Sequence, residues 1–179
     1  MKGLTEADAF GVLRQIVSEQ RLVGSSGSIR GSFRCVCFTE APESAFHQLS
    51  GRYRPFGIKV SKKWLFKQGG RPVIYQHSDE FATLPDALRW RHVRYEPDAE
   101  PPIDFSWERE WRIQADELFL PPEEVAVVVP HENYAAELQD EHFYNEHMRV
   151  TFLKTAWGEL AAFETEQPFA YELTVLPPE

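Results

Sequence analysis

Long apolar runs, low-complexity tracts and internal repeats are all missing from this chain of 179 residues. Its longest apolar run is Val125–Val129, far short of the ~20 residues that a transmembrane helix needs. The first six residues, MKGLTE, contain no apolar signal region, so we expect a cytoplasmic protein. Aromatic residues make up 13% of the chain, which argues against disorder and favours a single domain over residues 1–179.

Cysteine is almost absent as well, with only Cys35 and Cys37. They lie two residues apart on one face of a predicted strand, a spacing that suits neither an easy disulfide nor a complete zinc site. We interpret both as small reduced core residues of a cytosolic protein. His142 and His147 are five apart on a predicted helix and point in different directions, so they do not form the pair that zinc helices use. No metal is expected.

Acidic residues are missing from segment 44–78, although the net charge of the chain is −9. Residues 1–78 carry 12 Lys and Arg against 5 Asp and Glu, whereas residues 79–179 carry 7 against 23. Basic and aromatic side chains are interleaved in residues 52–71, which is typical of surfaces that bind phosphates and stack on bases. The alternative is a solvated helix face whose charge balances the acidic half of the fold. The pI near 5.2 argues against a protein that coats nucleic acid non-specifically.

The pattern of apolar residues and turn signals indicates an α+β fold. Thr5 is expected to cap a first helix, with Asp8 closing a capping box. The continuous apolar run Val125–Val129 predicts a central strand. We expect further strands in residues 34–39, 56–60, 72–75, 108–115, 149–154 and 170–176, and helices in residues 42–49, 61–69, 81–93 and 133–147. Three tryptophans are expected in the core: Trp64, Trp90 and Trp157.

The stretch FSWEREWRI, residues 105–113, is the most informative part of the chain. Side chains alternate faces along a strand, which predicts one face with Glu108, Glu110 and Arg112 and another with Trp107, Arg109, Trp111 and Ile113. Two glutamates and an arginine beside large aromatic rings suit a site that holds a polar substrate and stabilises a developing positive charge. A solvent-facing ladder of Glu–Arg pairs explains the same spacing.

Four ordered blocks of the sequence carry a family resemblance: GSFRCVCFTEAP (31–42), YRPFGIKVSKK (53–63), GGRPVIY (69–75) and WEREWRI (107–113). Together they resemble the bacterial abortive-infection AbiGi family and its relatives, which are similar to DarT-like ADP-ribosyltransferase toxins. The resemblance covers roughly residues 4–130 and leaves residues 131–179 unassigned. It implies an ADP-ribosyltransferase-like split β-sheet with flanking helices, NAD as substrate, and a role in phage defence or a toxin–antitoxin system.

The same resemblance implies roles for individual residues. Glu110 falls where such families hold their catalytic glutamate, and Glu108 precedes it in an E-x-E arrangement that positions the acceptor. The strand end formed by Phe38, Thr39 and Glu40 falls where the nicotinamide half of NAD is held. The candidates for holding the pyrophosphate and the ring are Arg34, Tyr53, Arg54 and Arg112. Cleaving the nicotinamide–ribose bond develops positive charge on the ribose, which a fixed carboxylate stabilises.

Three functions therefore remain open. The first is an enzyme that cleaves NAD and transfers ADP-ribose to nucleic acid or protein, for which we expect Glu110→Ala to abolish turnover and leave the fold intact. The second is a catalytically inactive, antitoxin-like protein of the same fold that binds a cognate partner. Related sequences begin with a His-x-Thr-like strand, whereas only MKGL precedes the first helix cap here. Either the start codon is assigned too far downstream, or part of the NAD site is lost, and the loss favours this second function. The third is a nucleic-acid-binding module that uses residues 52–71.

Overall fold

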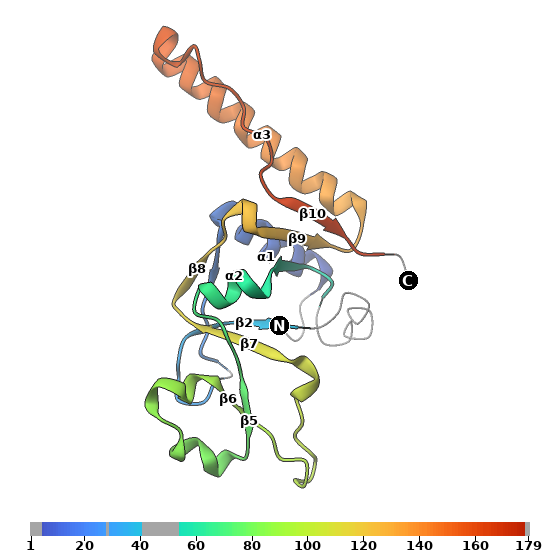
Figure 1. Ribbon diagram of the computed structural model, residues 1–179. Coiled ribbons are helices and arrows are strands. Elements are labelled where there is room, and N and C mark those ends of the chain that lie inside the picture. Colours follow the sequence, from blue (N-terminus) through green and yellow to red (C-terminus); the bar gives the residue numbers. More distant parts are fainter. Residues whose placement is uncertain (1–4, 28, 41–53, 178–179) are drawn as a thin grey trace.

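The computed structural model describes residues 5–27, 29–40 and 54–177 (Figure 1). Within these residues the chain is mixed α+β, as predicted, and its strands form four small sheets. Two sheets have three strands, in the orders β10–β9–β3 and β2–β7–β4, and two are pairs, β1–β8 and β5–β6. The predicted helix 42–49 and Tyr53 lie outside the described residues.

The elements follow one another along the chain with short connections. The α-helices are α1 (Glu6–Glu19), α2 (Lys62–Lys67) and α3 (Glu132–Trp157). The strands are β1 (Arg21–Val23), β2 (Cys35–Thr39), β3 (Gly57–Val60), β4 (Arg71–Pro72), β5 (Ile74–Gln76), β6 (His92–Arg94), β7 (Glu110–Gln114), β8 (Glu117–Phe119), β9 (Val125–Val129) and β10 (Glu172–Val175). The 3-10 helices are η2 (Ser78–Thr83), η3 (Asp86–Arg91), η4 (Ser106–Glu108), η5 (Pro122–Glu124) and η6 (Gly158–Ala161).

The capping box predicted at the start of α1 is confirmed. The hydroxyl of Thr5 accepts a hydrogen bond from the backbone N–H of Asp8 at 3.1 Å, and the Asp8 carboxylate accepts one from the backbone N–H of Thr5 at 3.0 Å. These bonds satisfy two N–H groups that a helix start would leave without partners. The helix then buries Phe10 and Leu13, so the cap fixes where this apolar side meets the core.

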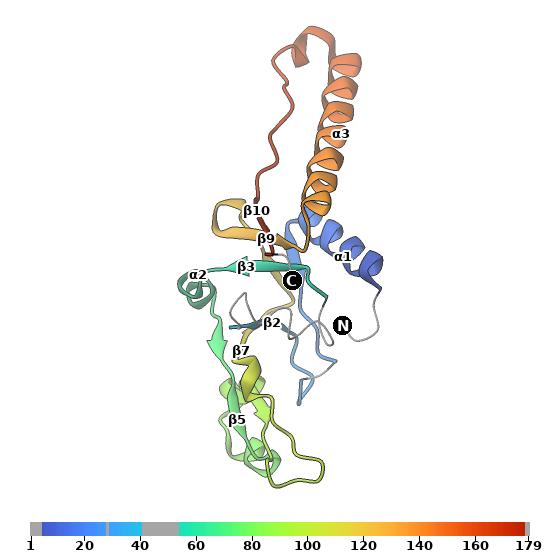
Figure 2. The same cartoon turned by 90° about the vertical axis from the view of Figure 1, so that its right-hand side faces the viewer.

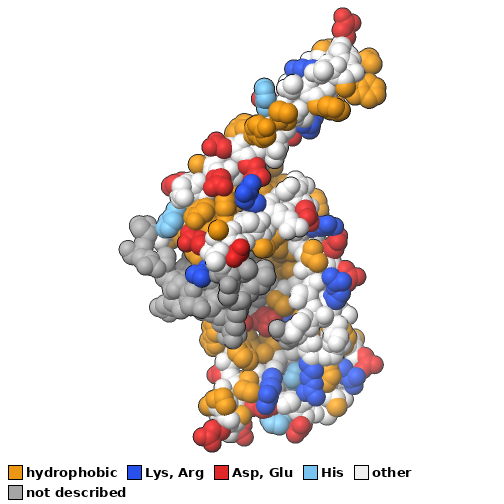
Figure 3. Space-filling model, turned by 180° about the vertical axis from the view of Figure 1, so that it is seen from behind, with side chains coloured by type: hydrophobic (Ala, Val, Ile, Leu, Met, Phe, Trp, Pro, Cys, Tyr) orange, Lys and Arg blue, Asp and Glu red, His pale blue; other side chains and the backbone are white. Residues whose placement is uncertain are grey.

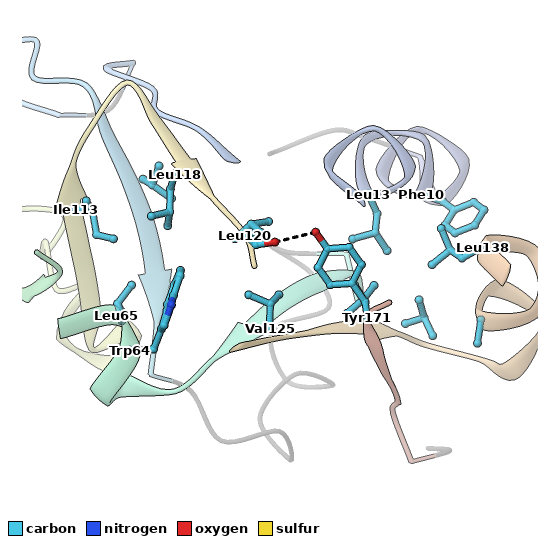
Figure 4. Packing of buried hydrophobic residues seen from close by; sticks show 14 residues of the cluster. Phe10, Leu13, Trp64, Leu65, Ile113, Leu118, Leu120, Val125, Leu138 and Tyr171 are labelled. Atoms are coloured by element: carbon cyan, nitrogen blue, oxygen red, sulfur yellow. Dashed lines mark hydrogen bonds between the residues drawn. The ribbon is translucent and has the colours of Figure 1, made fainter. Parts of the chain in front are cut away.

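The core is organised around β9, which is buried along its whole length. It pairs antiparallel with β3 and parallel with β10, as expected for a central strand. Trp64 and Leu65 of α2 belong to the same cluster of buried residues. Figure 4 shows Tyr171 reaching across this cluster, where its hydroxyl donates a hydrogen bond of 2.9 Å to the carbonyl of Leu120. A buried hydroxyl with a partner avoids the free-energy cost of an unsatisfied polar group.

Three sequence-based predictions of secondary structure are wrong. His92 and Val93, expected at the end of a helical segment, belong to β6. Residues 149–154, expected as a strand, are part of α3, which continues ten residues past the predicted end at His147. The predicted strand 108–115 begins only at Glu110, because residues Ser106–Glu108 form η4 and Arg109 is left-handed with φ 45°. Glu108 and Arg109 therefore do not alternate with the residues of β7, and the E-x-E pair does not share one strand face.

Helix α3 leaves the body of the protein and forms a projecting arm (Figures 1 and 2). Its first turns pack on the body, where the rings of Tyr134, Phe10 and Phe56 contact one another. Further along, the chain that follows α3 runs back beside the helix in both views. We call residues 142–170 the arm. Trp157, expected in the core, lies on it and is exposed.

Candidate functional site

The sheet β2–β7–β4 has one apolar and one polar face. Its antiparallel register places Cys37 opposite Arg112 and Thr39 opposite Glu110. Residues opposite each other in a sheet point to the same side, so these four side chains form one polar face. On the other face, the core cluster contains Val36 and Ile113, and the flanking Phe38 and Trp111 pack against it. The predicted separation of Glu110 and Arg112 from Trp111 and Ile113 is thus confirmed.

An ion pair between Glu110 and Arg112 lies at the centre of the polar face. Nε of Arg112 donates to Oε1 of Glu110 at 2.7 Å, and Nη2 donates to Oε2 at 3.2 Å. The side chains of Arg112 and Glu110 are only 6% and 14% exposed. Burial works against the charged guanidinium, but the hydrogen bonds and charge of Glu110 outweigh it and raise the pKa of Arg112. Arg112 therefore stays charged although it is largely removed from water.

Arg112 also joins this sheet to the segment that covers it. Its Nη1 donates hydrogen bonds of 3.0 Å to the carbonyls of Trp90 and His92. Both carbonyls belong to the region of η3 and β6, and Trp90 packs there with Cys35. One guanidinium thus satisfies a carboxylate and two backbone carbonyls from a part of the chain about twenty residues away. This matches the planar, five-donor geometry of arginine.

Cys37 and Tyr75 complete the surroundings of Glu110. The hydroxyl of Tyr75 accepts a hydrogen bond from the backbone N–H of Glu110 at 3.1 Å. Removal from water raises the pKa of the Cys37 thiol to about 12, and the charge of Glu110 and a hydrogen bond to it add to the shift. Both cysteines are free thiols. Cys35 is buried as predicted, but Cys37 is exposed, so its assignment to the core is wrong.

A second group of polar contacts lies where β2 ends. Thr39 donates a hydrogen bond of 2.5 Å to the carbonyl of Glu108. The Glu40 carboxylate accepts hydrogen bonds from Lys62 at 2.8 Å and from Nε1 of Trp111 at 3.1 Å. These hydrogen bonds lower the pKa of Glu40, and the one from Lys62 has the largest effect. All four sequence blocks that carry the resemblance therefore contribute a residue to this site: Thr39 and Glu40, Lys62, Tyr75, and Glu110 with Arg112.

The structure brings together only part of the predicted site. Thr39, Glu110 and Arg112 lie on one face, whereas Phe38 points to the core face. Arg34 lies beyond the opposite end of β2, where it donates to the carbonyl of Gly24 at 3.0 Å and pairs with Asp116 at 3.2 Å. Arg54 is exposed, and Tyr53 is outside the described residues. The roles in NAD binding that the resemblance implies for these residues stay predictions.

Sequence reasoning missed three members of the site: Cys37, Tyr75 and Lys62. Tyr75 and Lys62 stand in the quoted blocks, so their position in those blocks was the available signal. Cys37 alternates with Val36 and Phe38, and this alternation already placed it on the polar side of its strand.

Some basic side chains of segment 52–71 make their contacts within the protein itself. Lys62 pairs with Glu40, and the guanidinium of Arg71 lies 3.8 Å from the ring centre of Phe66 while it donates to the carbonyls of Phe66 and Gly70. Among the described residues, no group of three or more His, Cys, Asp and Glu side chains is placed to hold a metal ion. None of the helices in this part of the chain is long and apolar enough to cross a membrane.

The chemistry available at the site is that of a fixed, charge-balanced network. Glu110 has a defined orientation, because Arg112 holds its carboxylate and Tyr75 holds its backbone. Thr39 and Cys37 are the polar residues beside it on the same face. Comparison of the chain with models of protein families, with curated proteins and with solved structures finds no match.

Proposed function

We propose that this chain is a binding protein with an ADP-ribosyltransferase-like split sheet, which engages a protein partner in phage defence or a toxin–antitoxin system and does not itself cleave NAD. The observation that carries the proposal is the ion pair of Glu110. Both oxygens of Glu110, the carboxylate that the resemblance makes the catalytic one, accept hydrogen bonds from Arg112.

Cleavage of the nicotinamide–ribose bond needs a negative charge that is free to stabilise the positive charge developing on the ribose. A guanidinium within 3.2 Å of both carboxylate oxygens already balances the charge of Glu110. Arg112 cannot swing aside without leaving the buried carbonyls of Trp90 and His92 without a partner, which costs about 1–3 kcal/mol for each group. Glu110 is therefore a structural group that holds Arg112 in place.

A groove between α2 and β8 supports a binding role. It has a volume of about 320 Å³, and its lining includes Trp64 of α2, Gln68 directly after that helix, and Phe119 of β8. Among the described residues, strand β8 pairs only with β1, so the backbone along the groove has an edge that an extended partner segment can join. Lys63 and Lys67, which precede Trp64 and Gln68 in the sequence, are exposed and favour a partner segment with acidic residues.

The decisive experiment is a nicotinamide-release assay on the purified chain with NAD, run beside calorimetric titration. Glu110→Gln is the matched control, because it keeps the shape of the side chain and removes its charge. We expect no release above that of the control. Release by the wild-type chain that Glu110→Gln abolishes would overturn the proposal and establish the enzyme. The binding role is tested by calorimetric titration of the chain with the protein product of the adjacent gene. We expect binding, and we expect Phe119→Asp to weaken it.

Catalysis remains the second candidate because one observation favours it. The register sets Thr39 directly opposite Glu110, with Cys37 next to them, and Thr39 is exposed, so a solvent-accessible polar group adjoins the carboxylate. In this alternative NAD is the substrate, Glu110 binds a ribose hydroxyl, and Arg112 orients the carboxylate. Glu108 then acts from η4 and not from the strand.

A further inference from the structure

Two arginines at one edge of the sheet β2–β7–β4 have no acidic partner. Arg71 of β4 lies directly opposite Arg112 of β7. Arg91, the last residue of η3, reaches the same strand, because its Nε donates a hydrogen bond of 2.9 Å to the carbonyl of Pro72. Glu110 balances the charge of Arg112, whereas no carboxylate in the described part of the chain forms an ion pair with Arg71 or Arg91. Two positive charges are therefore left unbalanced at this edge, which is unfavourable.

Both guanidiniums are fixed by contacts that leave most of their N–H groups unused. Nη1 of Arg71 donates to the carbonyls of Phe66 and Gly70 at 3.0 and 2.7 Å, and Arg91 donates only through Nε. A guanidinium carries five N–H groups in a planar fork. Within the described residues, those on Nε and Nη2 of Arg71 and on Nη1 and Nη2 of Arg91 therefore have no acceptor. Nε and Nη2 form the edge of the fork that binds two oxygens of one oxyanion.

The positive charge of Arg91 is disfavoured where it lies. Removal from water lowers the pKa of Arg91, and the charge of Arg71 lowers it further. The two guanidiniums therefore lie close enough to repel each other. Figure 3 shows several Lys and Arg side chains close together on the lower part of the molecule, which contains β5 and β6. An anion that contacts both Arg71 and Arg91 would remove their repulsion and accept hydrogen bonds from their unused N–H groups.

We propose that Arg71 and Arg91 together bind the terminal phosphate of a nucleotide. Such a phosphate carries a charge of about −1.5 to −2 at pH 7 and three acceptor oxygens, which matches two guanidiniums with unused donors. Phe66 favours a nucleotide over a free phosphate. The guanidinium of Arg71 lies 3.8 Å from the centre of its ring, yet Phe66 is still 51% exposed. An exposed ring beside a phosphate-binding arginine is a surface on which a base can stack.

The first test is calorimetric titration of the full chain with AMP at low salt, beside adenosine, inorganic phosphate and phosphoserine. We expect AMP to bind at least about 10-fold more tightly than inorganic phosphate or phosphoserine, because only AMP adds a stacked base, and adenosine to bind undetectably. Absence of AMP binding overturns the inference. Equal affinity for AMP and for inorganic phosphate or phosphoserine overturns the assignment to a nucleotide.

Three arginine variants locate the bound phosphate. Arg71→Gln and Arg91→Gln should each weaken AMP binding at least about 10-fold, because each removes charge-assisted hydrogen bonds. Arg21→Gln is the matched control, since Glu19 and Glu117 already balance the charge of Arg21. Circular dichroism and urea unfolding show whether each variant keeps its fold. Equal weakening by all three variants, or undiminished binding by Arg71→Gln and Arg91→Gln, would place the phosphate elsewhere and overturn the inference.

A second measurement uses the wild-type chain and does not depend on how the variants fold. The NMR signal of the Arg71 Nε–H group, which has no acceptor among the described residues, should shift as AMP is added, while that of Arg21 stays in place. An unshifted Arg71 signal overturns the inference. The inference does not rest on the proposed function, because NAD has only bridged phosphates and no terminal one, and neither test involves NAD.

Discussion

The polar face of β2–β7 and the arm reverse the usual distribution of side chains in opposite ways. In the body, the charged side chains of Glu110 and Arg112 are largely buried, whereas on the arm, rings such as Phe152 and Phe163 are exposed. A buried charge is tolerated only where its partners lie within the same chain, and Arg112 has all of its partners there. An exposed group of rings needs a partner outside the chain. Changes in the first region should thus affect the stability of the fold, and changes in the second should affect association with a partner.

The chain offers a matched pair of ion pairs with which to test this contrast. Arg14 and Glu141, where α1 meets the first turns of α3, form a two-bond pair with distances of 2.6 and 2.7 Å, much like that of Arg112 and Glu110. Their side chains, however, are 42% and 37% exposed. The two pairs share their two-bond geometry. They differ in burial and in the bonds of Arg112 to the carbonyls of Trp90 and His92, so a difference in stability between their variants measures burial together with this network.

The largest effect is expected for Glu110→Ala. This change leaves the buried guanidinium of Arg112 without its carboxylate, which should lower the free energy of unfolding by about 3–5 kcal/mol. Glu141→Ala should cost less than about 1 kcal/mol, because water screens the exposed pair. Urea unfolding of both variants makes the measurement. Equal losses would mean that burial does not distinguish the two pairs.

This expectation corrects the sequence-based one, under which Glu110→Ala would leave the fold intact. The alternation in EREWRI correctly placed Glu110 and Arg112 on one face, because a strand fixes that spacing. It gave no sign that the face is covered, since the covering carbonyls come from Trp90 and His92, about twenty residues earlier. Nor does any local rule predict the left-handed Arg109 that separates Glu108 from the strand, because residues other than glycine rarely adopt it.

The arm was missed for a related reason. Residues 149–154, RVTFLK, have the β-branched and aromatic composition of a strand, and six residues cannot decide between strand and helix. The informative signal was the absence of Gly and Pro from residue 131 to residue 157, followed by Gly158 with φ 52°. A stop signal at Gly158 predicts a helix of the observed length. That the helix leaves the body follows from tertiary contacts, which no window of sequence contains.

The reactivity of Cys37 gives a second, smaller difference between the regions. With a pKa raised to about 12, the thiol should react with iodoacetamide at pH 8 at least about 100-fold more slowly than an ordinary exposed thiol. Phe163→Cys supplies that ordinary thiol on the arm, and fragment mass spectrometry separates the sites. Glu110→Gln should speed the reaction of Cys37 by removing the nearby negative charge. Equal rates for Cys37 and for the thiol introduced by Phe163→Cys would show that the polar face does not suppress the thiolate.

The same shift has a consequence for stability. A thiol whose pKa is higher in the folded than in the unfolded chain stays protonated while the unfolded thiol, with its ordinary pKa near 9, ionises. The contribution of Cys37 is therefore constant below about pH 9. Stability should fall as the pH rises from about 9 towards 12.

The smallest expected difference is between the pKa values of two carboxylates, Glu96 and Glu146, each of which accepts a hydrogen bond from a backbone N–H. In the body, Glu96 accepts from Ser78 at 3.2 Å, and its side chain is 6% exposed. On the arm, Glu146 accepts from Gln167 at 3.0 Å and holds the returning chain. Hydrogen bonds from Arg94 and Ser78 lower the pKa of Glu96 to about 2, and those from Arg149 and Gln167 lower the pKa of Glu146.

A carboxylate with a lowered pKa contributes stability above its unfolded pKa and loses that contribution as the pH falls through its folded value. Both contacts should therefore be intact above about pH 4.5, and acid should release the Gln167 amide before the Ser78 amide. The amide chemical shifts of these two residues, followed by NMR from pH 6 to pH 2, report the two midpoints. The Ser78 midpoint should lie near pH 2, and that of Gln167 above it. A shared midpoint would mean that arm and body titrate as one unit and that the returning chain is held as firmly as the buried network.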